Sequence, residues 1–295
     1  MDKTNPLLGR GALLLATIIW GAAFVLMDFT LDSVSTLYIL AFRFIGAAVI
    51  MLIVSFRFLK KIDRNYLAGG AAMGLALFLA FTVQTYGLMH TTPGKNAFLT
   101  ASYCIMVPFI YWITNKTRPD RYNILAAFIG LIGIGLISVN QYVSINIGDA
   151  LTLVCAFFFA LHIVISGLVV GGRNILLLCL IQFATAGILA AAGALIFEPF
   201  PQNVPASTAL ALAFLTLVAT AFCLLLQIFG QKHTPPSQAS IIMTFEAVFG
   251  IISSLIAGKE ELSVKLAIGF LFSFTAVIIS ETKLNFLKRK KAVGL

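Results

Sequence analysis

Two stretches of the chain decide the expected fold: Tyr86-Gly87-Leu88-Met89-His90-Thr91-Thr92-Pro93 and Phe229-Gly230-Gln231-Lys232-His233-Thr234-Pro235-Pro236. In register they share glycine, histidine, threonine and proline. Each divides an apolar run, 66–114 or 206–257, that is too long for one membrane crossing. Because proline favours the first turn of a helix and cannot continue the one before it, each stretch predicts a tight turn between two helices.

The composition around these stretches indicates an integral membrane protein. The chain has 295 residues, of which 60% are hydrophobic and 11% charged, whereas a soluble domain carries about 25% charged residues. Apolar runs between charged or Pro/Gly-rich positions predict an all-α protein with ten transmembrane helices in a lipid bilayer. The expected spans are 11–28, 35–55, 66–88, 94–114, 122–140, 148–170, 174–197, 206–231, 235–257 and 263–283.

The basic residues predict the orientation of these spans. With the N-terminus inside, the outer side holds only Lys95, Lys259 and Lys265, and Arg43 is the only basic residue well inside a span. The inner side holds Lys3, Arg10, Arg57, Lys60, Lys61, Arg64, Lys116, Arg118, Arg121, Arg173, Lys232, Lys283, Lys288, Arg289, Lys290 and Lys291. This asymmetry predicts a multi-pass protein of a bacterial-type cytoplasmic membrane with both termini in the cytoplasm. We expect the basic tail, Lys288 to Lys291, to lie at anionic headgroups.

The chain also divides into two similar halves, 1–141 and 142–295. In each half the Gly-His-Thr-Pro stretch lies at the turn between the third and fourth predicted helices. A half with five helices, an odd number, makes the second half enter the membrane from the opposite side. Inverted-topology repeats of this kind are typical of secondary transporters, which bind substrate near the bilayer midplane.

Several other classes of function find little support. The net charge of +9 is explained by topology, so we expect no nucleic-acid partner. The four cysteines lie in apolar segments without metal-ligand spacing, and we interpret them as packing residues. Because HExxH, GxSxG and Walker A strings are absent, we predict no catalytic residue, metal or cofactor. A membrane-embedded enzyme, and a receptor or channel, remain the rival classes.

Five strings resemble motifs of the EamA family in the drug/metabolite transporter superfamily. They are Trp20-Gly21-Ala22-Ala23-Phe24, Phe42-Arg43-Phe44, Asn96 to Thr100 with Tyr103 and Val107-Pro108, Phe245-Glu246-Ala247-Val248-Phe249, and Gly258 to Ser263. The resemblance implies two inverted five-helix repeats around a central cavity. It also implies a small-molecule substrate: amino acids or similar metabolites in the export direction, with uptake or multidrug efflux as the alternative.

Two positions depart from the family pattern. Ala247 stands where the family usually has proline, which predicts a less kinked ninth helix. Lys259 interrupts the Gly-Glu pair of the following turn and leaves Glu260 as the nearest match.

Glu246 and Arg43 are the strongest candidates for substrate binding or coupling. An ionised carboxylate inside a span costs about 2.5–3.5 kcal/mol, so Glu246 is expected to face the interior, to be protonated or to have a partner. It either binds a proton or substrate amine, or fixes helix packing. Arg43 binds a substrate carboxylate, pairs with a structural acid, or extends towards the headgroups.

The remaining candidates are Trp20, Gln84, Lys95, Tyr103, His162 and Gln227. Lys95 is predicted near the outer mouth, in the first turn of a helix, where it either attracts an anion or is simply exposed. Trp20 either lines the cavity or packs in the core, and Gln84 and Gln227 either line the cavity or form hydrogen bonds between helices. His162 is either a proton relay or a satisfied interior group. Tyr103 is a candidate through its place in the resemblance.

Overall fold

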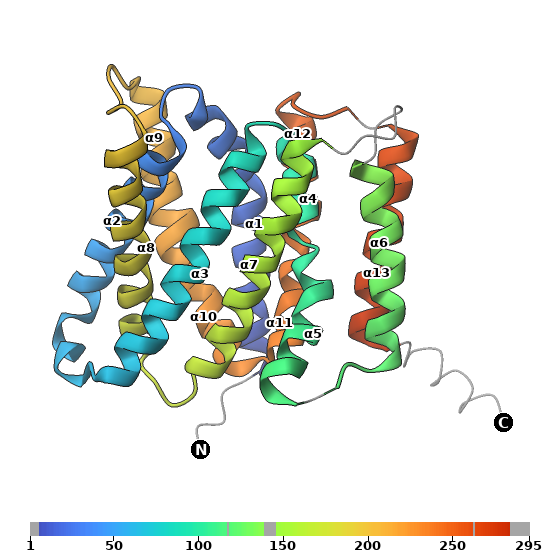
Figure 1. Ribbon diagram of the computed structural model, residues 1–295, viewed down its shortest axis with the longest axis horizontal. Helices are drawn as coiled ribbons and strands as arrows, with labels where there is room; N and C mark the ends of the chain where they lie inside the picture. Colours follow the sequence, from blue (N-terminus) through green and yellow to red (C-terminus); the bar gives the residue numbers. More distant parts are fainter. Residues whose placement is uncertain (1–5, 117, 139–145, 262, 284–295) are drawn as a thin grey trace.

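The computed structural model describes residues 6–116, 118–138, 146–261 and 263–283, and every regular element among them is helical (Figure 1). In the first half the elements are α1 (Pro6–Leu31), α2 (Thr36–Ser55), η1 (Phe56–Lys61), α3 (Arg64–Leu88), α4 (Pro93–Thr100), α5 (Tyr103–Asn115) and α6 (Arg121–Ser138). In the second half they are α7 (Ile147–Val169), α8 (Ile175–Phe197), α9 (Ala206–Phe214), η2 (Leu215–Phe222), α10 (Cys223–His233), α11 (Pro236–Met243), α12 (Phe245–Ile256) and α13 (Val264–Thr282).

Within the described residues, eight helical segments are long and apolar enough to cross a membrane. They correspond to the first four predicted spans of each half, with α4 and α5 forming one segment, α9, η2 and α10 another, and α11 and α12 a third. The helices α6 and α13 occupy the predicted fifth and tenth spans and pack against each other at one edge of the bundle (Figure 1). An all-helical membrane protein is therefore confirmed.

Both predicted tight turns are present. In the first, α3 ends at Leu88 and α4 begins at Pro93; in the second, α10 ends at His233 and α11 begins at Pro236. Thr92 caps α4, because its hydroxyl accepts a hydrogen bond from the backbone amide of Lys95.

Two of the spans are interrupted near their middle. The first break, at Ala101 and Ser102, separates α4 from α5, and the second, at Thr244, separates α11 from α12. The ninth predicted span is thus interrupted although no proline stands at position 247. A third span, α9 to α10, stays continuous but widens into the π-helical segment η2.

The two ends of the bundle carry opposite charges. The acidic end holds Asp28, Asp32, Asp149, Glu198, Glu260 and Glu261, while the basic end holds Arg10, Arg64, Lys116, Arg173 and Lys232. Helix α1 begins and α13 ends at the basic end (Figure 1). Lys3, the tail at 288–291 and the division between residues 141 and 142 lie outside the described residues.

Contacts across the two halves hold the bundle together: α2 packs on α8, α3 on α7, and α1 on both α10 and α12. Helices α1 and α12 approach closely because Gly21 faces the backbone of Phe249 and Gly250. Gly70 and Gly74 of α3 similarly lie against Ile181 and Gln182 of α8, as expected for packing glycines.

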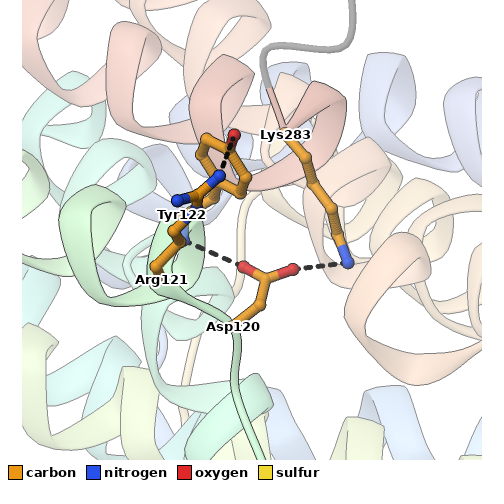
Figure 2. A network of polar contacts seen from close by, with 4 residues as sticks. All are labelled: Asp120, Arg121, Tyr122 and Lys283. Carbon is orange, nitrogen blue, oxygen red and sulfur yellow. Dashed lines mark hydrogen bonds and ion pairs between the residues drawn. The ribbon is translucent and has the colours of Figure 1, made fainter.

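Polar contacts at the basic end join α6 to the residue after α13 (Figure 2). Lys283 Nζ lies 2.5 Å from Asp120 Oδ2, and the other oxygen of Asp120 accepts a hydrogen bond of 3.0 Å from the Tyr122 amide. Arg121 donates to the Tyr122 hydroxyl at 3.3 Å. These contacts fix the helix pair at that end.

Candidate functional site

A cavity of about 50 Å³ lies within the bundle and is lined by both halves. Its walls are Trp20, Ala23, Phe24, Met27, Arg43, Phe81, Gln84, Thr85, Leu88, Asn96, Thr100, Tyr103, Phe159, Leu224, Gln227, Met243 and Glu246. Six of the eight candidates from the sequence are in this set, all but Lys95 and His162. Residues far apart in the chain thus share one cavity.

Glu246 and Tyr103 reach the cavity from the two interrupted spans. Glu246 lies in the first turn of α12 and Tyr103 begins α5, and their side chains are 5% and 2% exposed. The two groups interact with each other, although in the described structure Tyr103 Oη and Glu246 Oε1 form no hydrogen bond of standard geometry. The two side chains are therefore close to each other in the cavity wall.

Arg43 is 3% exposed, which excludes the expected alternative that it extends to the headgroups. Its Nε donates to Thr220 Oγ1 at 2.9 Å, and its guanidinium lies 4.8 Å from the centre of the Phe81 ring. Its Nη1 lies 3.6 Å from Met27 Sδ. No described carboxylate forms an ion pair with it, so the structural acid expected as one alternative is not found. A buried cation without a counter-ion is suited to an anionic group.

Trp20 both lines the cavity and joins two helices, since its Nε1 donates to the Ala219 carbonyl at 2.8 Å. Ala219 belongs to η2, whose wide turns alter the α-helical hydrogen-bond ladder. The two alternatives for Trp20 are therefore compatible.

Gln84 belongs to a polar network beside the cavity. The Gln84 Nε2 donates to Thr100 Oγ1 at 3.1 Å. Asn96 Nδ2 donates to the backbone carbonyl of Gln84 at 3.2 Å and to Thr152 Oγ1 at 2.8 Å. Asn96 is fully buried with Oδ1 unpartnered. We did not predict Asn96 or Thr100 as site residues, although both lie in the strings that resemble the EamA family.

Gln227 occupies the corresponding place in the second half. It donates to Gln231 Oε1 at 3.1 Å, and Gln231 in turn donates to the Ile163 carbonyl at 2.9 Å. Gln227 therefore combines cavity lining with a contact between helices, as Gln84 does.

Lys95 lies outside the cavity, at the acidic end. Its ammonium group interacts electrostatically with Asp149 and Glu260, which accept hydrogen bonds from Thr91 (2.7 Å) and Thr92 respectively. Burial raises the pKa of the Glu260 carboxyl, while the Thr92 hydroxyl opposes that change. Lys95 thus belongs to a charged cluster that joins the α3–α4 turn to α7 and to the α12–α13 loop.

His162 also lies outside the cavity. It is fully buried on α7 and forms a hydrogen bond of 3.0 Å between Nε2 and Gln182 Oε1, while its Nδ1 has no partner in the described structure. Of the two expected roles, proton relay or satisfied interior group, the structure shows an interior group that is hydrogen-bonded at Nε2 alone.

All four cysteines are buried and free, in agreement with their interpretation as packing residues. Among the described residues, no group of three or more His, Cys, Asp or Glu is placed to hold a metal ion. A second space of about 440 Å³ with mainly apolar walls lies between the interrupted spans and α13.

Comparisons with known proteins agree with this architecture. A model of the EamA-like transporter family matches the chain twice, over residues 7–139 and 146–282. An uncharacterized transporter of Archaeoglobus fulgidus is 31% identical over 267 residues, covering 90% of this chain and 83% of its own length. The uncharacterized transporter YrdR of Bacillus subtilis is 25% identical over 169 residues, which cover 54% of this chain and 52% of YrdR.

A solved crystal structure shares the fold, with a TM-score of 0.73 and 15% sequence identity over 93% of this chain and 97% of the other. Two family matches, one in each half, account for the repeated Gly-His-Thr-Pro turn and for a cavity lined from both halves. The chain therefore belongs to the EamA-like transporter family.

Proposed function

We propose that the protein is a secondary transporter that exports amino acids or similar small, hydrophobic or aromatic metabolites by alternating access. The observation that carries the proposal is a cavity inside the bundle with a buried arginine and a buried carboxyl group in its walls. No nucleotide-binding string is present in the sequence, so an ion gradient is the proposed source of energy.

The fold supports this mechanism. Helix α1 begins at the basic end, whereas α7, the first helix of the second half, begins at the acidic end beside Thr91 (Figure 1). With α6 and α13 as the proposed fifth and tenth spans, this arrangement supports the proposal of two inverted five-helix repeats. Rocking of such repeats about a central cavity exposes the cavity to one side at a time.

The cavity supports a zwitterionic substrate with an apolar side chain. Arg43, which has no ion-pair partner among the described residues, offers a cation for a carboxylate, and Glu246 offers an acid for an ammonium group or a proton. Trp20, Phe81 and Phe159 supply aromatic walls for the remainder of the substrate. We assign the basic end to the cytoplasm on the distribution of charge.

The test is transport by purified protein in proteoliposomes preloaded with unlabelled amino acids. We expect labelled amino acids with apolar or aromatic side chains to exchange across the membrane, and exchange to fail in protein-free vesicles. An imposed proton gradient is expected to drive net accumulation. Exchange of cationic drugs without any exchange of amino acids would identify a multidrug carrier and contradict the proposed substrate class.

A further inference from the structure

The two family matches allow the halves to be aligned residue by residue. Trp20-Gly21 aligns with Phe159-Ala160, and Arg43-Phe44 with Gln182-Phe183. Alignment of the two Gly-His-Thr-Pro stretches places Gln84 opposite Gln227 and Tyr103 opposite Glu246. Every residue of the cavity wall thus has a counterpart in the other half.

For one group of wall positions, both members of the aligned pair line the cavity. These pairs are Trp20 and Phe159, Phe81 and Leu224, Gln84 and Gln227, Thr100 and Met243, and Tyr103 and Glu246. They form the part of the cavity common to both halves, near the two helix breaks.

The rest of the wall comes from the first half alone. It consists of Ala23, Phe24, Met27, Arg43, Thr85, Leu88 and Asn96. Their counterparts His162, Ile163, Ser166, Gln182, Ile228, Gln231 and Ala239 are all buried and none lines the cavity. The space therefore extends on the first-half side only, and the equivalent region of the second half is closed.

Four of the closed counterparts are polar: His162, Ser166, Gln182 and Gln231, which we call the closed cluster. His162 pairs with Gln182, Gln231 bonds the carbonyl of Ile163 beside His162, and Ser166 lies one turn further along α7. Yet His162 Nδ1 and Ser166 Oγ have no hydrogen-bond partner in the described structure, and Gln182 Nε2 has only a weak interaction with Cys179. A buried polar group without a full set of partners destabilises the fold, so a purely structural role leaves these side chains unexplained.

We propose that the closed cluster is the second, hidden half of the substrate path. When the bundle opens at the basic end, His162, Ser166, Gln182 and Gln231 take the wall positions that Ala23, Met27, Arg43 and Leu88 hold now. They then form a neutral hydrogen-bonding site for water and for the polar group of a zwitterionic substrate. This inference rests on the proposed alternating access, and it explains why His162 was found outside the cavity.

The experiment measures access to Ser166 from the basic end. The four native cysteines, at 104, 155, 179 and 223, are replaced, and Ser166→Cys is introduced. Vesicles with the basic end outward are treated with a membrane-impermeant maleimide, and labelling of the peptide that contains position 166 is followed by mass spectrometry. The matched control is Ala190→Cys, a fully buried position on α8 that belongs neither to the cavity nor to the closed cluster.

In a second experiment, a cross-link holds the basic end of the bundle closed. Arg10 Nη2 lies 3.4 Å from Gln238 Oε1 there, so Arg10→Cys with Gln238→Cys can be joined by a short, reducible bifunctional thiol reagent before labelling. We expect Ser166→Cys to react about tenfold faster than Ala190→Cys. The cross-link should lower its rate to that of the control, and reduction should restore it.

Equal labelling of the two cysteines, or labelling of position 166 that the cross-link does not change, would overturn the inference. Gln182→Cys provides a second position if Ser166→Cys does not elute as a monodisperse protein. Amino-acid exchange is measured on the same preparations. Exchange without labelling refutes the hidden path and leaves the transporter intact, whereas labelling without any exchange supports the path and refutes the proposed substrate.

Discussion

Tyr103 and Glu246 hold equivalent places in two interrupted spans, each in the first turn after the break and each facing the same cavity. One position carries a phenol and the other a carboxyl group, so the pair breaks the near-symmetry of the cavity at the point where the two halves meet. A proton taken up at this point binds the Glu246 carboxyl group, with the Tyr103 hydroxyl beside it.

Replacement of Glu246 by glutamine is expected to abolish accumulation driven by a pH gradient and to preserve exchange at equal pH on both sides. The amide keeps the volume and hydrogen-bonding capacity of the side chain but cannot release a proton. Measurements of both modes in proteoliposomes separate coupling from binding. Proton-driven accumulation that is unchanged would exclude Glu246 as the coupling group.

Replacement of Arg43 by lysine is expected to weaken substrate binding by about 10- to 100-fold, the range for loss of a hydrogen bond to a charged group. Lysine retains the charge but loses the planar fork and the stacking on Phe81. Binding is measured by titration in detergent, with the exposed Arg10→Lys as the control. Full affinity in Arg43→Lys would refute recognition of a carboxylate by two guanidinium nitrogens.

Gly21→Ala is expected to lower the thermal stability of the detergent-solubilised protein, by about 1–3 kcal/mol in free energy of unfolding. A Cβ atom at Gly21 would lie 2.3 Å from Phe249 Cβ and 2.7 Å from the Gly250 nitrogen, and backbone cannot easily move aside. Gly11→Ala, on the same helix, has nothing within 4 Å and is the control. If both variants unfold at the same temperature, the close approach of α1 and α12 is not as described.

Glu198→Gln is expected to destabilise the protein by about 0.5–2 kcal/mol. The Glu198 carboxylate caps α2, accepting bonds from the amides of Leu37 (2.9 Å) and Tyr38 (3.3 Å) and from the Tyr86 hydroxyl (3.0 Å). Thermal unfolding measures the effect, and the exposed Asp32→Asn at the same end is the control. A loss of stability as large in Asp32→Asn would point to general surface charge instead of the cap.

Glu260 is expected to give the folded protein a pH-dependent stability at the acidic end. Because burial raises its pKa, the folded state binds the proton more tightly than the unfolded state. Its contribution to stability is therefore greatest below the ordinary carboxyl pKa and falls as the pH rises through the raised value. Unfolding temperatures from about pH 4 to about pH 8 should decline less in Glu260→Gln than in the wild type. The exposed Glu261→Gln is the control, and an equal decline in all three proteins would contradict the assignment.

The helix pattern was largely accessible from the sequence, because it depends on apolar length and on proline. Pro93 and Pro236 mark the tight turns within their predicted positions. The breaks at Ala101–Ser102 and at Thr244 were not predicted, since those residues lie within apolar spans without an adjacent proline or glycine. Such breaks depend on tertiary contacts that a linear pattern does not contain.

The cavity was predictable in part. Six candidates were found because ionisable, amide or large aromatic groups are conspicuous inside apolar helices. Phe81 and Phe159 were not, because an aromatic wall residue looks in sequence like any other phenylalanine of the membrane core. The isolation of Arg43 from carboxylates could only come from the arrangement of all the helices. His162 was a candidate by chemistry, but its burial is a property of the conformation.

The hydrogen bond from Trp20 to Ala219 has a practical consequence. The chain holds two tryptophans, and the other, Trp112, is 39% exposed on α5. A Trp112→Phe protein therefore carries a single indole, placed in the cavity wall and attached to η2. Its fluorescence spectrum reports the polarity of the cavity directly, so ligand occupancy can be followed without a label and before any substrate is identified.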